Sequence, residues 1–425
     1  MKTEIKKLEK SNIEINVALD WQELETYYQK ALKQLSSRVK MEGFRPGKAP
    51  ANMVADKVGD SHILEDAAEA AIHEKYHEVV RQEGIEPISK PEVAVLKLAK
   101  NNPFEFKIRV AVLPDVDLPD YKKIVSSVEK KTVQVDENEV EETLKWIRRS
   151  RAEFSDLSRP CQKGDWLEIE YQSPKVEMNR KFEDGFLLGE GKFVPGFEDN
   201  LIGLETNGEK DFKITFPSEY FNKELAGQEA DFKVKVRAVK EMKLPEFDDE
   251  FARKIGRFKD ASELRANIKD GIQKEKDNGE LQNWRSSVLE KISQEMAVEL
   301  PESMTTAEKE KMLADIKKEV DERLKISFED YLKQVGKTGQ ELEADLAGQA
   351  EQRIKGFLVL RAIIKKEGIE ATVDEINREI DKFLTSYPQE HQQEIDRERL
   401  KEYYKEKIEH EKVFQLLESF AGIVE

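Results

Sequence analysis

A histidine pair in the first quarter of the chain has the spacing of a metal site. His73, Glu74 and His77 match the H-E-x-x-H pattern of zinc peptidases, which places both imidazoles on one helix face. A catalytic zinc site also needs a third ligand and an enclosed cavity. On a helical wheel both histidines fall beside the apolar stripe, on its polar side. We therefore expect no metal and interpret the motif as a solvated helix surface, with a zinc metallopeptidase as a remote alternative. The stripe consists of Leu64, Ala68, Ile72, Tyr76 and Val79.

The single cysteine, Cys161, excludes an intramolecular disulfide and favours a reducing compartment. We interpret it as an ordinary small side chain rather than a nucleophile. No run of about 18 apolar residues, the length that a membrane span requires, occurs in the sequence. The sequence therefore predicts a cytoplasmic protein without a membrane partner, and no glycine-rich phosphate loop or other pattern indicates a cofactor.

The net charge of −17 argues against general binding of nucleic acid, but one segment has the opposite charge. Residues 28–58 contain seven Lys and Arg against two acidic residues. Within that segment, residues 43–50 read GFRPGKAP, in which two glycines and two prolines predict an exposed turn. Phe44 between cations suits an anionic, partly apolar surface such as RNA with protein. A plain basic loop is the alternative.

Aromatic residues are concentrated in the middle of the chain. Residues 166–171, 210–216 and 231–239 read as short strands separated by glycine turns, which predicts a compact antiparallel sheet. From the residues alone, the aromatic side chains would be assigned to the hydrophobic core.

The flanking regions differ in character from this sheet. Alternating apolar residues predict strands at 5–8, 13–19, 93–98 and 104–112, and Asp20 with Glu23 predicts a capped helix start. Prolines and acids at 113–120 indicate a linker, followed by a strand at 132–135 and a helix that begins at Asp136. Beyond Pro245 the chain is almost entirely helix-forming. The stripe predicted for the first helix consists of Trp21, Leu24, Tyr28, Ala31, Leu35 and Val39.

Three groups of motifs resemble the bacterial trigger factor family. The segment 43–50 matches the family's GFRxGKxP ribosome-docking signature, and residues 193–199, FVPGFED, resemble its FKBP-like domain. In the helical part, residues 249–256, 298–302 and 358–370 also resemble the family, so the similarity extends along nearly the whole chain.

This resemblance implies a multidomain α+β fold. It predicts an N-terminal α+β ribosome-binding domain at 1–112, a linker strand and helix at 113–150, an FKBP-like antiparallel β domain at 151–243, and an all-α C-terminal substrate-binding chaperone domain at 244–425. The docking residues that it implies are Gly43, Phe44, Arg45, Pro46, Gly47, Lys48, Ala49 and Pro50. The implied proline pocket consists of Tyr171, Phe182, Phe193, Val194, Phe197, Tyr220 and Phe232.

The resemblance further implies an ATP-independent chaperone with peptidyl-prolyl cis-trans isomerase activity, partly associated with ribosomes. Its partners would be the large ribosomal subunit near the tunnel exit and nascent or unfolded polypeptides. The sequence leaves open whether the free protein forms a weak homodimer. Between Tyr171 and Gly189 the chain is shorter than is usual in the family, and it lacks the TG turn expected there. A ribosome-bound holdase whose FKBP-like domain has lost isomerase activity is therefore the alternative function.

Overall fold

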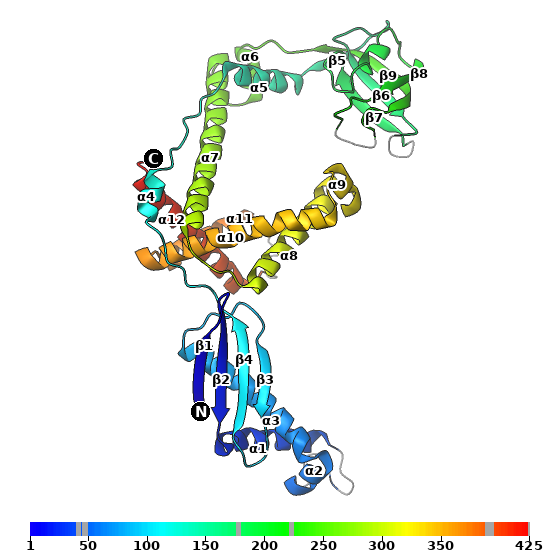
Figure 1. Ribbon diagram of the computed structural model, residues 1–425. Coiled ribbons are helices and arrows are strands. Elements are labelled where there is room, and N and C mark those ends of the chain that lie inside the picture. The colour runs from blue at the N-terminus through cyan, green and yellow to red at the C-terminus, as the bar shows by residue number, and fades with distance from the viewer. Residues whose placement is uncertain (40–43, 45–49, 176–179, 221–224, 387–394, 424–425) are drawn as a thin grey trace. The chain divides into compact units, whose positions relative to one another are not determined.

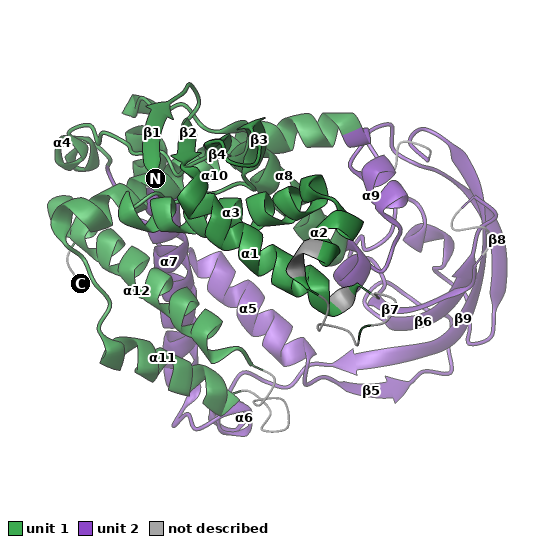
Figure 2. Ribbon diagram, turned by 90° about the horizontal axis from the view of Figure 1, so that it is seen from below, with its two compact units in different colours: residues 1–128, 286–319, 340–425 green, residues 129–285, 320–339 purple. Residues whose placement is uncertain are grey.

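The computed structural model describes residues 1–39, 44, 50–175, 180–220, 225–386 and 395–423 (Figure 1). The chain forms two compact units, each assembled from segments that are distant in sequence (Figure 2). One unit comprises residues 1–128, 286–319 and 340–425, and the other comprises residues 129–285 and 320–339. Each unit is described by itself below.

The first unit begins with a four-stranded antiparallel sheet in the order β1-β2-β4-β3. Every second residue of β2 is buried, so one face of this strand points into the core, as alternation predicts. Helix α3 lies along the sheet (Figure 1). The strands are β1 (Lys2–Lys7), β2 (Asn12–Leu19), β3 (Glu92–Lys97) and β4 (Phe104–Ala111), and the helices are α1 (Trp21–Arg38), α2 (Ala51–Val58) and α3 (Asp60–Gln82).

The apolar stripes predicted for α1 and α3 both face the hydrophobic core of the first unit. In α1, Leu24 and Leu35 are buried, and in α3, Leu64 and Val79 are buried. The predicted capping box of α1 is present, because the Asp20 side chain accepts from the Glu23 backbone and the Glu23 side chain accepts from the Asp20 backbone.

The remainder of the first unit is helical. Short helix α4 is held against the C-terminal helices, because the buried Tyr121 hydroxyl donates to Glu367 and the Lys122 ammonium lies 4.9 Å from the Phe420 ring centroid. The helices are α4 (Tyr121–Ser126), the end of α7 (Ala261–Glu295), α8 (Glu302–Glu319), α10 (Gly339–Glu367), α11 (Val373–Ser386) and α12 (Arg397–Phe420).

The second unit contains a five-stranded antiparallel sheet and a helical part. Strand β9 is long enough to pair with β6 along one edge and with β5 and β8 along the other. The strands are β5 (Glu153–Asp156), β6 (Trp166–Gln172), β7 (Phe182–Leu187), β8 (Glu209–Thr215) and β9 (Glu229–Lys243). The helical part consists of α5 (Glu137–Arg149), α6 (Asp249–Ile255), the first part of α7, a π-helical turn (Val320–Leu324) and α9 (Phe328–Gln334).

The fold class agrees with the sequence prediction, whereas one predicted strand is absent. The antiparallel sheet and the helical C-terminal region are present as expected. The strand predicted at 132–135 is wrong: these residues pair with no strand, and side chains of α7 bind their backbone instead. Gln273 Nε2 donates to the Val133 carbonyl at 3.0 Å, and Lys276 Nζ donates to the Gln134 carbonyl at 3.0 Å.

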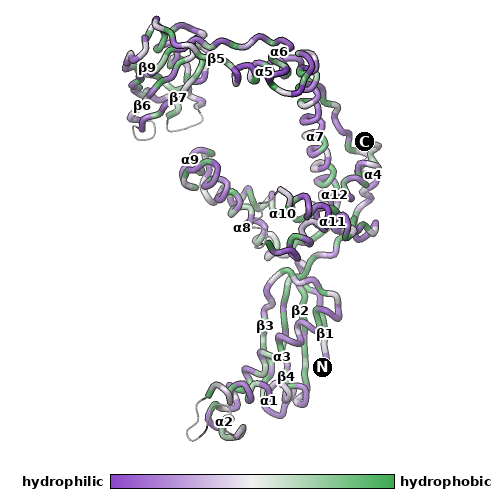
Figure 3. The backbone as a smooth tube through the Cα atoms, turned by 180° about the vertical axis from the view of Figure 1, so that it is seen from behind, coloured by the Kyte–Doolittle hydropathy of each residue, from purple (hydrophilic) through white to green (hydrophobic). Residues whose placement is uncertain are grey.

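Among the described residues, no helix is long and apolar enough to cross a membrane. Figure 3 shows the corresponding pattern, since hydrophobic and hydrophilic residues are mixed along the long helices. Such mixing is typical of helices that bury one face and expose the other to water.

Candidate functional site in the antiparallel sheet domain

The candidate proline pocket begins on the inner face of β6. Leu167 and Ile169 are buried on this face, and Tyr171 follows at the next inward position, where it is half-buried. The antiparallel register places Tyr171 opposite Phe182 on β7 and opposite Val234 on β9. The rings of Tyr171 and Phe182 stack with their centroids 5.4 Å apart. The pairing of β6 with β7 therefore brings Phe182, which the family resemblance assigned to the pocket, into contact with Tyr171.

A loop after β7 adds the next part of the cluster. The Phe193 and Phe197 rings stack with their centroids 4.5 Å apart, and Tyr171 meets the edge of Phe193 at 5.5 Å. Val194 is half-buried and packs against the same core. Gly196 has a φ of +87°, a conformation that favours glycine and that turns the chain between the two phenylalanines. A short 3-10 helix, η2 (Glu198–Asn200), follows.

Strand β9 and the segment after β8 complete the cluster. Phe232 meets Phe197 edge to face with their centroids 5.3 Å apart, and it lies 6.2 Å from Phe216. Phe216 in turn contacts the Tyr220 ring at 4.7 Å. Burial raises the pKa of the Tyr220 hydroxyl. All side chains predicted for the pocket thus belong to one continuous cluster, although they come from separate strands and loops.

The cluster also contains rings that the sequence analysis did not assign to the site. Phe186 contacts Phe193 at 4.9 Å, and Phe212 contacts Phe197 at 5.3 Å. Phe216 links Tyr220 to the rest of the cluster. Phe212, Ile214 and Phe216 alternate in the strand predicted at 210–216, which was the available sequence signal for two of these rings.

The chemical character of this cluster is apolar and aromatic, with half-buried rings at its edge. Tyr171, Phe182 and Phe193 are half-buried, whereas Phe197 and Phe232 are buried beneath them. Such a surface can accept a small apolar ring and remove water from an adjacent amide bond. A rotation about a peptide bond needs no nucleophile or general base.

The predicted docking segment is described only in part. Phe44 is 40% exposed, and Pro50 is exposed at the start of α2. Residues Gly43, Arg45, Pro46, Gly47, Lys48 and Ala49 lie outside the described residues.

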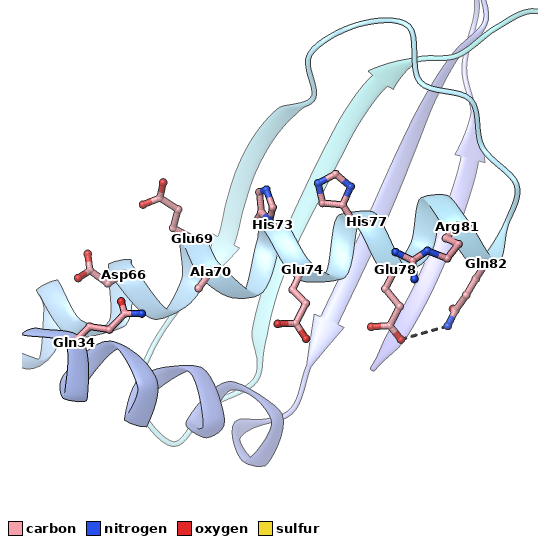
Figure 4. Close-up of a pocket in the computed structure, with 10 residues that line it drawn as sticks. All are labelled: Gln34, Asp66, Glu69, Ala70, His73, Glu74, His77, Glu78, Arg81 and Gln82. Carbon is pink, nitrogen blue, oxygen red and sulfur yellow. Dashed lines mark hydrogen bonds between the residues drawn. The ribbon is translucent and has the colours of Figure 1, made fainter. Parts of the chain in front are cut away.

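The histidine pair lies on the exposed side of α3. His73 and His77 are neighbours, with ring centroids 4.7 Å apart, and they point away from the side of the helix that carries Glu74 (Figure 4). In a zinc peptidase the glutamate must act at the metal that both histidines bind. In the part of the chain that the structure describes, no group of three or more His, Cys, Asp or Glu side chains could hold a metal ion. Nothing therefore supports the metallopeptidase alternative.

The architecture and the aromatic cluster define a multidomain protein with an FKBP-type domain. A family model described as FKBP-type peptidyl-prolyl cis-trans isomerase matches residues 158–237, which include the whole cluster. Models described as bacterial trigger factor protein and as its C-terminus match residues 1–147 and 260–419.

Curated relatives extend this similarity over most of the chain. The trigger factor of Carboxydothermus hydrogenoformans is 34% identical over 397 residues, covering 92% of each chain. That of Caldicellulosiruptor bescii is 32% identical over 377 residues, covering 88% of this chain and 85% of the relative. The chain therefore belongs to the trigger factor family, the ribosome-associated chaperones that carry an FKBP-type domain.

A solved structure has the same fold. It is described as "Promiscuous Substrate Recognition in Folding and Assembly Activities of the Trigger Factor Chaperone" and is 21% identical to this chain. The two chains match with a TM-score of 0.54 over 97% of this chain and 98% of the other.

Proposed function

We propose that this protein docks at the tunnel exit of the large ribosomal subunit, shields nascent polypeptides without ATP, and isomerises Xaa-Pro bonds in them. Docking is assigned to residues 43–50, and isomerisation to the aromatic cluster of the FKBP-like domain at 151–243. The domain at 1–112 serves as ribosome anchor and the domain at 244–425 as client-binding body, and residues 113–150 link the anchor to the FKBP-like domain. The protein works in the cytoplasm, partly bound to ribosomes and partly free.

The observation that carries the isomerase proposal is the continuity of the aromatic cluster. Rotation about an Xaa-Pro bond is slow because amide resonance must be lost, at a cost of about 18–20 kcal/mol. The resonance form is charge-separated, so an apolar site that excludes water disfavours it relative to the twisted amide. The half-buried Tyr171 and Phe193 could hold the proline ring over the buried Phe197, and any interaction made only with the twisted amide would accelerate rotation.

The docking proposal is supported by the position of Phe44. This side chain is exposed, and Phe44 lies a few residues before α2 in the sequence, within a segment of net positive charge. An exposed aromatic ring among cations can contact both a protein surface and ribosomal RNA phosphates.

An isomerase assay on an Xaa-Pro peptide tests the enzymatic part. The full chain should accelerate isomerisation, and Tyr171→Ala should lower kcat/KM by about tenfold because Tyr171 bridges Phe182 and Phe193. Phe154→Ala is the matched control, because Phe154 contacts Trp166 on the opposite face of the sheet from Leu167. A wild-type chain that prevents aggregation but leaves the peptide rate unchanged would instead support the holdase alternative, which the short segment between Tyr171 and Gly189 favours.

A further inference from the structure

A buried carboxylate lies directly beside the aromatic cluster. Glu198 follows Phe197 and is only 8% exposed. A buried carboxylate is costly unless hydrogen bonds compensate for the lost hydration. Here three backbone N–H groups donate to it: Gly189 at 2.7 Å and Gly191 at 3.3 Å to Oε2, and Phe193 at 3.3 Å to Oε1.

The loop that surrounds this carboxylate has a backbone that suits the task. Gly189 has a φ of +99° and Gly191 a φ of +76°, conformations that side chains with a Cβ rarely adopt. Backbone N–H groups in such loops can converge on an anion, and here the donors come from every second residue. The carboxylate therefore acts as an internal anion that holds residues 189–193 in one conformation.

This loop ends at a ring of the candidate pocket. The Phe193 backbone is bound to Glu198, and its ring stacks on Phe197 at 4.5 Å. Within the loop, Lys192 Nζ donates to Asp184 at 2.6 Å and to the Gly185 carbonyl at 3.3 Å, which ties the loop to β7. The exposed ion pair contributes little, because solvent screens it. The buried carboxylate is the stronger constraint.

From this geometry we infer that Glu198 is a positioning residue for prolyl isomerisation, acting through the backbone of Phe193. It touches no substrate. By fixing the backbone at Phe193, it keeps that ring in the wall of the pocket before the peptide binds. Displacement of a positioning group by about 1 Å can lower a reaction rate substantially. A Phe193 ring that is already in place before the peptide binds therefore favours faster isomerisation. The inference rests on the proposed isomerase function.

The test replaces the carboxylate in the full-length chain. In Glu198→Gln, one carboxylate oxygen is replaced by an amide NH2 group, which donates and does not accept. The three backbone N–H groups therefore lose one of the two oxygens that accept from them. We expect kcat/KM on an Xaa-Pro peptide to fall about tenfold, which corresponds to about 1.4 kcal/mol. Asp165→Asn is the matched control, because Asp165 is 6% exposed and accepts from Arg159 and the Gln162 N–H in another turn of the domain. It should lower the melting temperature without changing kcat/KM.

A double-mutant cycle with Phe193→Ala separates positioning from general destabilisation. If Glu198 acts through Phe193, Glu198→Gln adds little to the loss that Phe193→Ala already causes. Full activity in Glu198→Gln, an equal loss in Asp165→Asn, or an undiminished effect in the Phe193→Ala background each overturns the inference while leaving the isomerase proposal intact. An inactive wild type overturns both.

Discussion

Phe197 is the ring on which the candidate pocket depends most. It is 1% exposed and contacts Phe193, Phe212 and Phe232 at centroid distances of 4.5 to 5.3 Å. Phe197→Ala removes these contacts together and leaves a cavity, because the strands around it are fixed by the sheet. Truncation of a buried phenylalanine costs about 3–5 kcal/mol, a large part of the roughly 5–15 kcal/mol that stabilises a typical domain.

This loss of stability predicts a large decrease in the melting temperature measured by calorimetry. Each kcal/mol of lost stability lowers the melting temperature of a domain of about 60–100 residues by about 4–8 °C. The melting temperature of the FKBP-like domain should therefore fall by at least about 12 °C. The isomerase rate at 10 °C, where the domain is still folded, should also fall by tenfold or more because the floor of the pocket is lost. Scanning calorimetry of the full chain and a peptide assay measure the two effects.

A control at Phe154 makes this test specific. Phe154 is 45% exposed and contacts Trp166, so Phe154→Ala should cost about 1 kcal/mol or less and leave the rate unchanged. The reasoning is refuted if Phe197→Ala leaves both the transition and the rate at wild-type values. A lowered transition with an unchanged rate would show that Phe197 belongs to the core but not to the pocket.

Two further predictions concern groups outside the pocket. Glu375 accepts from Lys412 at 2.7 Å and from the Thr372 backbone at 2.8 Å, which lowers its pKa from 4.5 to about 2. A lowered pKa stabilises the folded state above pH 4.5, and that stability is lost as the pH falls toward 2. The difference in melting temperature between the wild type and Glu375→Gln should therefore decrease below pH 4.5. A difference that stays constant with pH would contradict this. The fully buried Cys161 thiol donates to the Leu201 carbonyl at 2.9 Å, and burial raises its pKa. It should react with a thiol reagent only after denaturation, whereas fast labelling of native protein would contradict its burial.

Local patterns in the sequence were sufficient to predict several elements. The capping box at Asp20, the start of a helix at Asp136 and the buried face of α3 follow from spacing alone, because caps and stripes depend on residues within a few turns. Strand β7 was missed because its Asp184 and Gly185 interrupt the alternation. Its residues pair with β6 along its whole length, a contact between segments that periodicity does not encode.

The site was predictable to a different degree. The pocket residues were assigned through family resemblance, since their sequence positions extend from Tyr171 to Phe232 and no local pattern brings them together. Helix α4 was missed because its residues, such as Tyr121, are buried only through contacts with α10 and α12. Glu198 was also missed as a functional residue, because its importance comes from the backbone donors around it and not from its own type.

Ribosome co-sedimentation at moderate salt tests the central claim most directly. The variant combines Phe44→Ala, Arg45→Ala and Lys48→Ala, and the control combines His73→Ala and His77→Ala on the exposed side of α3. The account predicts that the wild type and the control pellet with ribosomes, more weakly as salt increases, whereas the docking variant stays in the supernatant. Equal pelleting of the docking variant and the wild type would contradict docking through this segment, and failure of the wild type to pellet would contradict ribosome docking itself.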